Sequence, residues 1–127
     1  MRTHSATFKK AERLCSLKTI GSLFDTGRSF NLQGIRVVYM FSEEDTLLPP
    51  ARILISVPKR NFKRAVDRNL LKRRIREAYR KNKAPLYDYL KVKNKRVDFA
   101  IIWTATTILP SSEITALIEE MIKRLSA

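Results

Sequence analysis

The positions of apolar residues predict a helix near each end of the chain. Near the start, residues 16–25 place three apolar side chains on one helical face, and Gly27 follows as a stop. Near the end, Pro110-Ser111-Ser112 offers a helix start, after which apolar residues recur at helical spacing. These residues are Ile114, Leu117, Ile118, Met121, Ile122 and Leu125. The C-terminal helix is therefore predicted to pack on a sheet.

Three segments have the composition of strands. Residues 34–41 and 52–57 are rich in β-branched and aromatic side chains, and an acidic stretch with Pro49-Pro50 separates them. Residues 97–104 form a nearly continuous apolar run, which is typical of a strand inside a sheet. Between the second and third strands, a helix is predicted over about residues 63–83, with Pro85 beyond it as a breaker.

A strand, a helix and a further strand in sequence indicate a βαβ unit. The predicted fold class is therefore α/β, a small two-layer sandwich of a mostly antiparallel sheet with helices. Residues 1–127 are predicted to form a single domain. By general base rate the crossover of the βαβ unit would be right-handed.

Composition adds a strong positive charge to this picture. The chain has 26 Lys and Arg against 12 Asp and Glu, a formal net charge of +14, while 44% of its 127 residues are hydrophobic. Charges of one sign repel one another in a folded domain, so a polyanionic partner is the simplest explanation for this excess of positive charge. No apolar run is long enough for a membrane span or a signal core, so a soluble, cytoplasmic protein with no membrane partner is expected.

The sequence offers little catalytic or metal-binding chemistry. The single cysteine, Cys15, excludes an internal disulfide and is expected to be a semi-buried apolar residue. The only histidine, His4, falls in a terminus that is expected to be frayed. The aspartates are scattered singly, so no protein metal site and no catalytic residue are predicted, although folding could still assemble a carboxylate cluster.

The strongest pattern is the segregation of charge on the middle helix. At about 100° per residue, five residues fall within an arc of roughly 100°, while apolar residues gather on another face. The arc consists of Asn69, Lys72, Arg73, Arg76 and Arg80. Asp67 and Glu77 project away from its centre, so (i, i+4) pairs on its own face are not expected to neutralise it. A row of cations about 16 Å long can track several phosphates, although the alternative is a merely solvated helix face.

The same helix resembles the signature helix of the ribonuclease P protein family. The resemblance rests on Lys59-Arg60-Asn61, Ala65-Val66-Asp67-Arg68-Asn69, Lys72-Arg73, Arg76-Glu77 and Arg80. It extends to Arg13-Leu14, Phe24, Gly27-Arg28-Ser29-Phe30 and residues 97–102. The second Arg of the family's RNR triplet is Leu70 here, which leaves the cationic arc complete but puts one lateral RNA contact in doubt.

The resemblance implies a partner of a catalytic RNA. In that family the RNA subunit carries out a magnesium-assisted hydrolysis that removes the 5′ leader from precursor tRNA, and the protein helps to bind substrate and metal. This chain is thus expected to be a single RNA-binding domain and a subunit of an endoribonuclease. Its expected partners are the catalytic RNA and precursor tRNA, and no protein partner is required. The RNA is expected to hold most of the Mg²⁺. The RNA-binding residues predicted in this way are Lys59, Arg60, Arg68, Asn69, Lys72, Arg73, Arg76 and Arg80.

The resemblance also implies a left-handed βαβ crossover and a cleft between the sheet and the first helix for the single-stranded leader. Ile20, Phe24 and Tyr39 match positions of that cleft. Phe24 and Tyr39 could stack on unpaired bases of any sequence, whereas Ile20 would line the cleft. The alternative is that these side chains belong to the core, as is expected of Trp103.

Three other functions stay open. A ribosomal or translation-associated RNA-binding protein would use the same basic helix without a role in cleavage. A self-sufficient nuclease would need a carboxylate cluster assembled by folding. A DNA-binding regulator fits less well, because the helix carries cations along its length and few side chains suited to reading bases.

Overall fold

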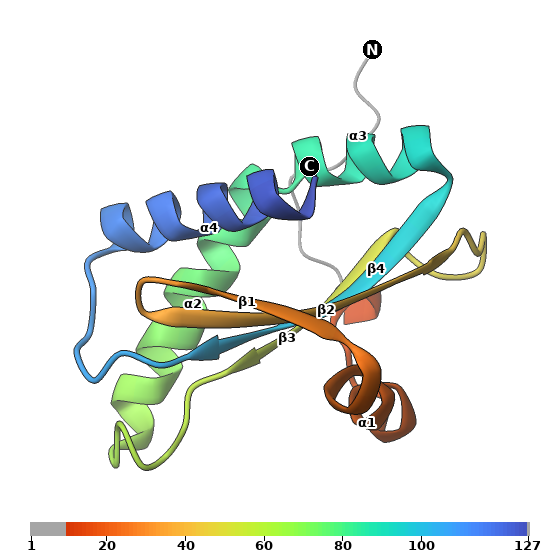
Figure 1. The fold of residues 1–127 in the computed structure, drawn as a ribbon. Coiled ribbons are helices and arrows are strands. Elements are labelled where there is room, and N and C mark those ends of the chain that lie inside the picture. Colours follow the sequence, from red (N-terminus) through yellow and green to blue (C-terminus); the bar gives the residue numbers. More distant parts are fainter. Residues whose placement is uncertain (1–9, 127) are drawn as a thin grey trace.

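The computed structural model describes residues 10–126 and places a four-stranded sheet at their centre (Figure 1). The strands are β1 (Arg28–Leu32), β2 (Ile35–Glu43), β3 (Ala51–Ser56) and β4 (Lys95–Trp103), in the spatial order β1-β2-β4-β3. β2 is antiparallel to β1 and β4, whereas β3 and β4 are parallel. The predicted α/β class and βαβ unit are confirmed, and β4 lies inside the sheet as expected. His4 lies outside the described residues.

Helices cover the two faces of the sheet unequally (Figure 1). A short 3₁₀ turn, η1 (Lys10–Glu12), precedes α1 (Leu17–Thr26), which lies alone on one face. The other face carries α2 (Ala65–Asn82), α3 (Ala84–Lys93) and α4 (Ser111–Leu125). The N–H of Thr19 donates to the Ser16 side chain at 3.3 Å, which caps the start of α1.

Two elements differ from the sequence prediction. The helix predicted over about residues 63–83 is α2, which ends before Pro85 as expected, but a further helix, α3, was not predicted. Pro85 lies in the first turn of α3, where the missing N–H of proline costs no helical hydrogen bond. The strand β1 was not predicted; it pairs with β2 through a tight turn in which Gly34 adopts a φ of +94°. Both elements are short, so their periodicity is weak.

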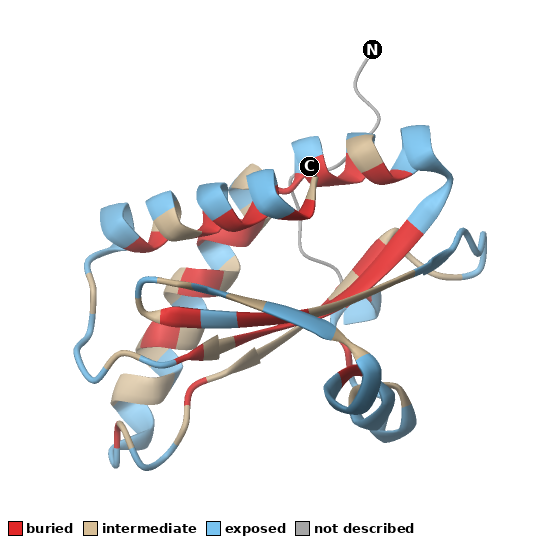
Figure 2. Ribbon diagram, in the orientation of Figure 1, coloured by how far each residue is buried: buried red, intermediate tan, exposed pale blue. Residues whose placement is uncertain are grey.

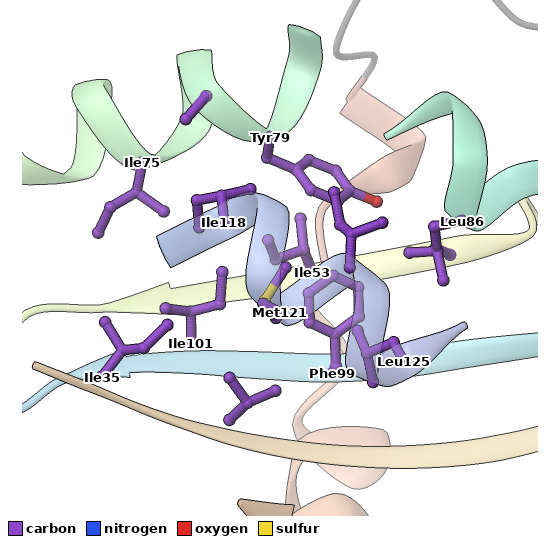
Figure 3. Close-up of a cluster of buried hydrophobic side chains, with 14 of the residues drawn as sticks. Ile35, Ile53, Ile75, Tyr79, Leu86, Phe99, Ile101, Ile118, Met121 and Leu125 are labelled. Carbon is purple, nitrogen blue, oxygen red and sulfur yellow. The ribbon is translucent and has the colours of Figure 1, made fainter. Parts of the chain in front are cut away.

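The larger core lies between the sheet and helices α2, α3 and α4. Figure 3 shows Tyr79 of α2 above Phe99 of β4, and their ring centroids are 5.8 Å apart at an interplanar angle of 65°. The predicted apolar stripe of α4 faces this core, with Leu117 only half-buried. Trp103 is fully buried, as expected. This packing fixes the orientation of α2 on the sheet.

The smaller core lies between the sheet and α1. Its buried members are Leu14, Leu23, Val38 and Ala100. The outer surface of α1 is exposed in Figure 2, and Leu17 and Phe24 keep 85% and 46% of their surface accessible. One short helix therefore covers this face only in part and leaves apolar surface in contact with solvent.

A buried ion cluster ties β3 to β4. Asp98 receives hydrogen bonds from Arg96 Nη2 at 2.7 Å and from Arg52 Nε at 2.9 Å. Burial alone would raise the pKa of Asp98, but the hydrogen bonds from the two guanidinium groups outweigh it and hold that pKa below its usual range. The carboxylate thus compensates two arginines that are largely removed from solvent.

Candidate nucleic-acid interface

The two faces predicted for α2 are confirmed. Its buried side chains are Leu71, Ile75, Ala78 and Tyr79. Asn69 and Arg73 are exposed on the cationic side, while Lys72 and Arg76 are partly exposed there. A helix that packs one face against the core must present its remaining residues outward, which here concentrates positive charge along one side of the fold.

A groove beside the edge strand β3 collects three cations from two parts of the chain. Its volume is about 180 Å³, and Lys72 and Arg76 of α2 line one side. Arg13 and Cys15 approach from the segment before α1, and residues 53–55 of β3 complete the wall. Cys15 is exposed, so the expectation of a semi-buried thiol is wrong.

The electrostatics of this groove favour an anion. Partial burial lowers the pKa of the Arg76 guanidinium, and the positive charge of Arg13 lowers it further. Arg76 nevertheless stays protonated at neutral pH, because an arginine remains charged well above that range. Two guanidinium groups and an ammonium group line this one groove, and a backbone phosphate has the appropriate charge and hydrogen-bond acceptors to bind there.

Arg80 differs from the rest of the cationic arc. It donates from Nε and Nη2 to the two carboxylate oxygens of Glu77, at 3.0 Å and 2.6 Å. These hydrogen bonds lower the pKa of Glu77. The prediction excluded only (i, i+4) pairs on the face of the arc; an (i, i+3) pair, which it did not consider, brings Glu77 and Arg80 together and neutralises the arc at this end.

Arg68 and the preceding basic residues have a different setting. Arg68 Nη1 donates to the carbonyls of Phe62 at 2.8 Å and Lys63 at 2.9 Å, so it fixes the loop that leads into α2. Lys59 and Arg60 are exposed in a turn in which the Asn61 N–H donates to the Pro58 carbonyl at 3.2 Å. The groove brings together Lys72 and Arg76 with the unpredicted Arg13.

The three residues predicted for the leader cleft do not share one face. Ile20 packs on the smaller core and Phe24 lies half-exposed on the same helix. Tyr39 points to the opposite side of the sheet, where its ring centroid lies 5.8 Å from those of Phe30 and Phe41. Placing Tyr39 in a cleft with α1 is therefore wrong, because neighbouring residues of a strand face opposite sides.

Within residues 10–126, no group of three or more His, Cys, Asp or Glu side chains could hold a metal ion. Among the same residues, no helix combines the length and apolar character needed to cross a bilayer.

Comparison with known sequences identifies relatives across most of the chain. The profile of the family described as Ribonuclease P matches residues 8–126. A "Ribonuclease P protein component" from Porphyromonas gingivalis is 43% identical over 90 residues, which cover 69% of this chain and 65% of the relative. One from Borrelia hermsii is 39% identical over 94 residues, which cover 72% and 73%. The match spans just under two thirds of the Porphyromonas gingivalis protein.

Solved structures share the fold. The RNase P protein from Staphylococcus aureus superposes with a TM-score of 0.65 at 23% identity, covering 91% of this chain and 95% of that one. The RNase P protein from Thermotoga maritima gives a TM-score of 0.63 at 24% identity, with coverage of 91% and 96%. The arrangement of sheet and helices is therefore the one found in these proteins.

The first prediction tests the cationic groove and the exposed arginine beside it. Arg73→Ala combined with Arg76→Ala should weaken RNA binding and reduce its salt dependence by about 0.7–0.9 log unit per lost phosphate contact. The thermal midpoint should change little, because solvated charges contribute little to folding stability. Fluorescence titration of a labelled RNA at several salt concentrations measures both quantities.

The matched control removes two charges from other surfaces. Lys93 is exposed on α3, and Lys123 is exposed on α4. Arg74 is unsuitable, because its Nη1 donates to the Leu109 carbonyl at 2.8 Å. Lys93→Ala combined with Lys123→Ala should have a much smaller effect; an equal loss from both pairs would show that net charge alone governs binding.

Proposed function

The chain belongs to the ribonuclease P protein family, and we propose that it is the protein subunit of ribonuclease P. In this role it assists a catalytic RNA in the endonucleolytic removal of the 5′ leader from precursor tRNA, in the cytoplasm and without a required protein partner. The observation that carries the proposal is the cationic groove of Arg13, Lys72 and Arg76 beside the exposed cations of α2. An RNA backbone supplies the repeated negative charge that such a surface binds.

In the proposed complex the protein and the RNA have different tasks. They provide guanidinium and ammonium groups for phosphates but no cluster of three acidic, cysteine or histidine side chains for a metal. In the proposal, which follows the family resemblance, the RNA performs the hydrolysis and holds most of the Mg²⁺ ions. The protein contributes by neutralising phosphate repulsion where catalytic RNA and substrate meet, which lowers the concentration of Mg²⁺ that the complex needs.

The α1 face is the proposed contact for the single-stranded leader. Phe24 offers a half-exposed ring, and Ile20, Met40 and Leu54 provide partly buried apolar surface around the smaller core. Unpaired bases can stack on an aromatic ring irrespective of their sequence, which suits leaders that differ among tRNAs. Tyr39 has no part in this contact, because it lies on the opposite face of the sheet.

The experiment that tests the proposed function is reconstitution with the ribonuclease P RNA of the same bacterium. At low Mg²⁺, adding the protein should raise the rate of precursor-tRNA cleavage, measured by separating the leader from the mature tRNA on a gel. The protein alone, treated to remove contaminating RNA, should not cleave. No stimulation of the cognate RNA, or cleavage that persists without RNA, would contradict the proposal.

A second prediction separates the two faces of the sheet. In the reconstituted complex, Phe24→Ala should weaken binding of precursors with long leaders by about 1–3 kcal/mol, because one stacking partner is lost. Binding of mature tRNA should be unchanged. Tyr39→Ala is the matched control, since it removes an aromatic ring from the opposite face and should affect both RNAs alike. A selective effect of Tyr39→Ala, or an unselective one of Phe24→Ala, would contradict the placement of the leader.

A further inference from the structure

A buried cluster joins the segment before α1 to the junction of α2 and α3. Glu12, at the end of η1, is only 5% exposed. Its Oε2 accepts a hydrogen bond from Lys83 Nζ at 2.6 Å and another from the Tyr87 hydroxyl. Lys83 and Tyr87 are themselves 3% and 6% exposed. An acid in such surroundings is stable only while its cationic and hydroxyl partners stay in place, so the cluster fixes η1 against the end of α2.

A second anchor follows within two residues. The Leu14 N–H donates to the Ile53 carbonyl at 2.9 Å, and Arg13 forms a parallel bridge with Ile53 at the outer edge of β3. Arg13 therefore lies between a buried side-chain anchor and a backbone anchor. Its backbone has little freedom to move away from the sheet edge, while its side chain is exposed at the groove.

This placement brings Arg13 close to a like charge. Its positive charge acts on Arg76, which lines the same groove. A backbone that was free to move could carry the Arg13 side chain away from the second guanidinium group and toward solvent. The two anchors hold its backbone beside α2 before any ligand binds, so RNA does not have to order the segment itself.

We propose that Glu12, with Lys83 and Tyr87, is a positioning cluster that sets Arg13 in the cationic groove of α2 and so preforms a site for an RNA backbone phosphate. Glu12, Lys83 and Tyr87 act through Arg13. The inference rests on the proposed function, which supplies the RNA, and it adds a phosphate contact from outside the basic helix. A purely structural cluster would stabilise the fold without a specific connection to Arg13.

The test is a double-mutant cycle on the full chain. Arg13→Ala removes the contact, Glu12→Gln removes the buried charge at nearly constant volume, and Tyr87→Phe removes one hydroxyl and keeps the ring. Each is made alone and each cluster variant is combined with Arg13→Ala. Affinity and its salt dependence are measured for the ribonuclease P RNA alone and for precursor tRNA bound to the reconstituted complex, with circular dichroism showing that each variant is folded.

Arg13→Ala should reduce the slope of log affinity against log salt concentration, the salt slope, by about 0.7–0.9 for at least one of the two RNAs. Tyr87→Phe should reduce the affinity and the salt slope for that RNA, and so should Glu12→Gln where it folds. Neither substitution should have a further effect in a protein that already carries Arg13→Ala. Asp98→Asn is the matched control, because it disrupts the other buried ion cluster. It should lower the thermal midpoint but leave the salt slope unchanged.

The inference is overturned if Tyr87→Phe leaves the affinity for both RNAs unchanged, or if its effect and that of Arg13→Ala simply add. It is also overturned if Asp98→Asn is coupled to Arg13→Ala as strongly as the cluster variants are. Failure of the proposed function has a different signature, since the unmodified protein would then neither bind nor stimulate the catalytic RNA. With binding and stimulation intact, absence of coupling counts against the positioning cluster alone.

Discussion

The packing of one face of α2 against the core is the constraint on which the rest of the structure depends. Along its other face, Lys72, Arg76 and Arg80 follow one another at (i, i+4) spacing, where like charges destabilise a helix. An isolated helix with this pattern would be marginal in water. Burial of Leu71, Ile75, Ala78 and Tyr79 against the larger core offsets that repulsion and holds the cations outward. The core thus stabilises the charged surface that the proposed function uses.

The sequence predicts those parts of the fold in which one periodicity dominates. The stripe of α4, the two faces of α2 and the interior strand β4 are of this kind, and the structure confirms them. The face of Tyr39 could not be predicted, because both sides of β2 are apolar: Val38 and Met40 face α1, whereas Tyr39 and Phe41 face the larger core. Because side chains alternate between the two sides of a strand, the sequence predicts the strand, but it does not predict which side contacts which helix.

The candidate site was predictable only where its residues share one helix. Lys72 and Arg76 follow from the arc on α2, but Arg13 enters the groove through backbone pairing with β3, which no local pattern indicates. Arg80 lies on the predicted arc, yet its rotamer pairs it with Glu77. The Glu12–Lys83 contact spans 71 positions of the chain and depends on the fold as a whole. Together these contacts make the proposed RNA surface a product of three separate segments.

The most direct test of this account uses the single cysteine, because Cys15 is exposed and lines the cationic groove. A short photoactivatable group attached to its thiol, in the reconstituted complex with ribonuclease P RNA and precursor tRNA, should crosslink to a small set of neighbouring nucleotides. A Cys15→Ser, Val92→Cys protein carries the same group on α3, where Val92 is 77% exposed, and should give little or no crosslinking. Efficient crosslinking from position 92 with none from Cys15 would contradict the assignment of the groove as the RNA interface.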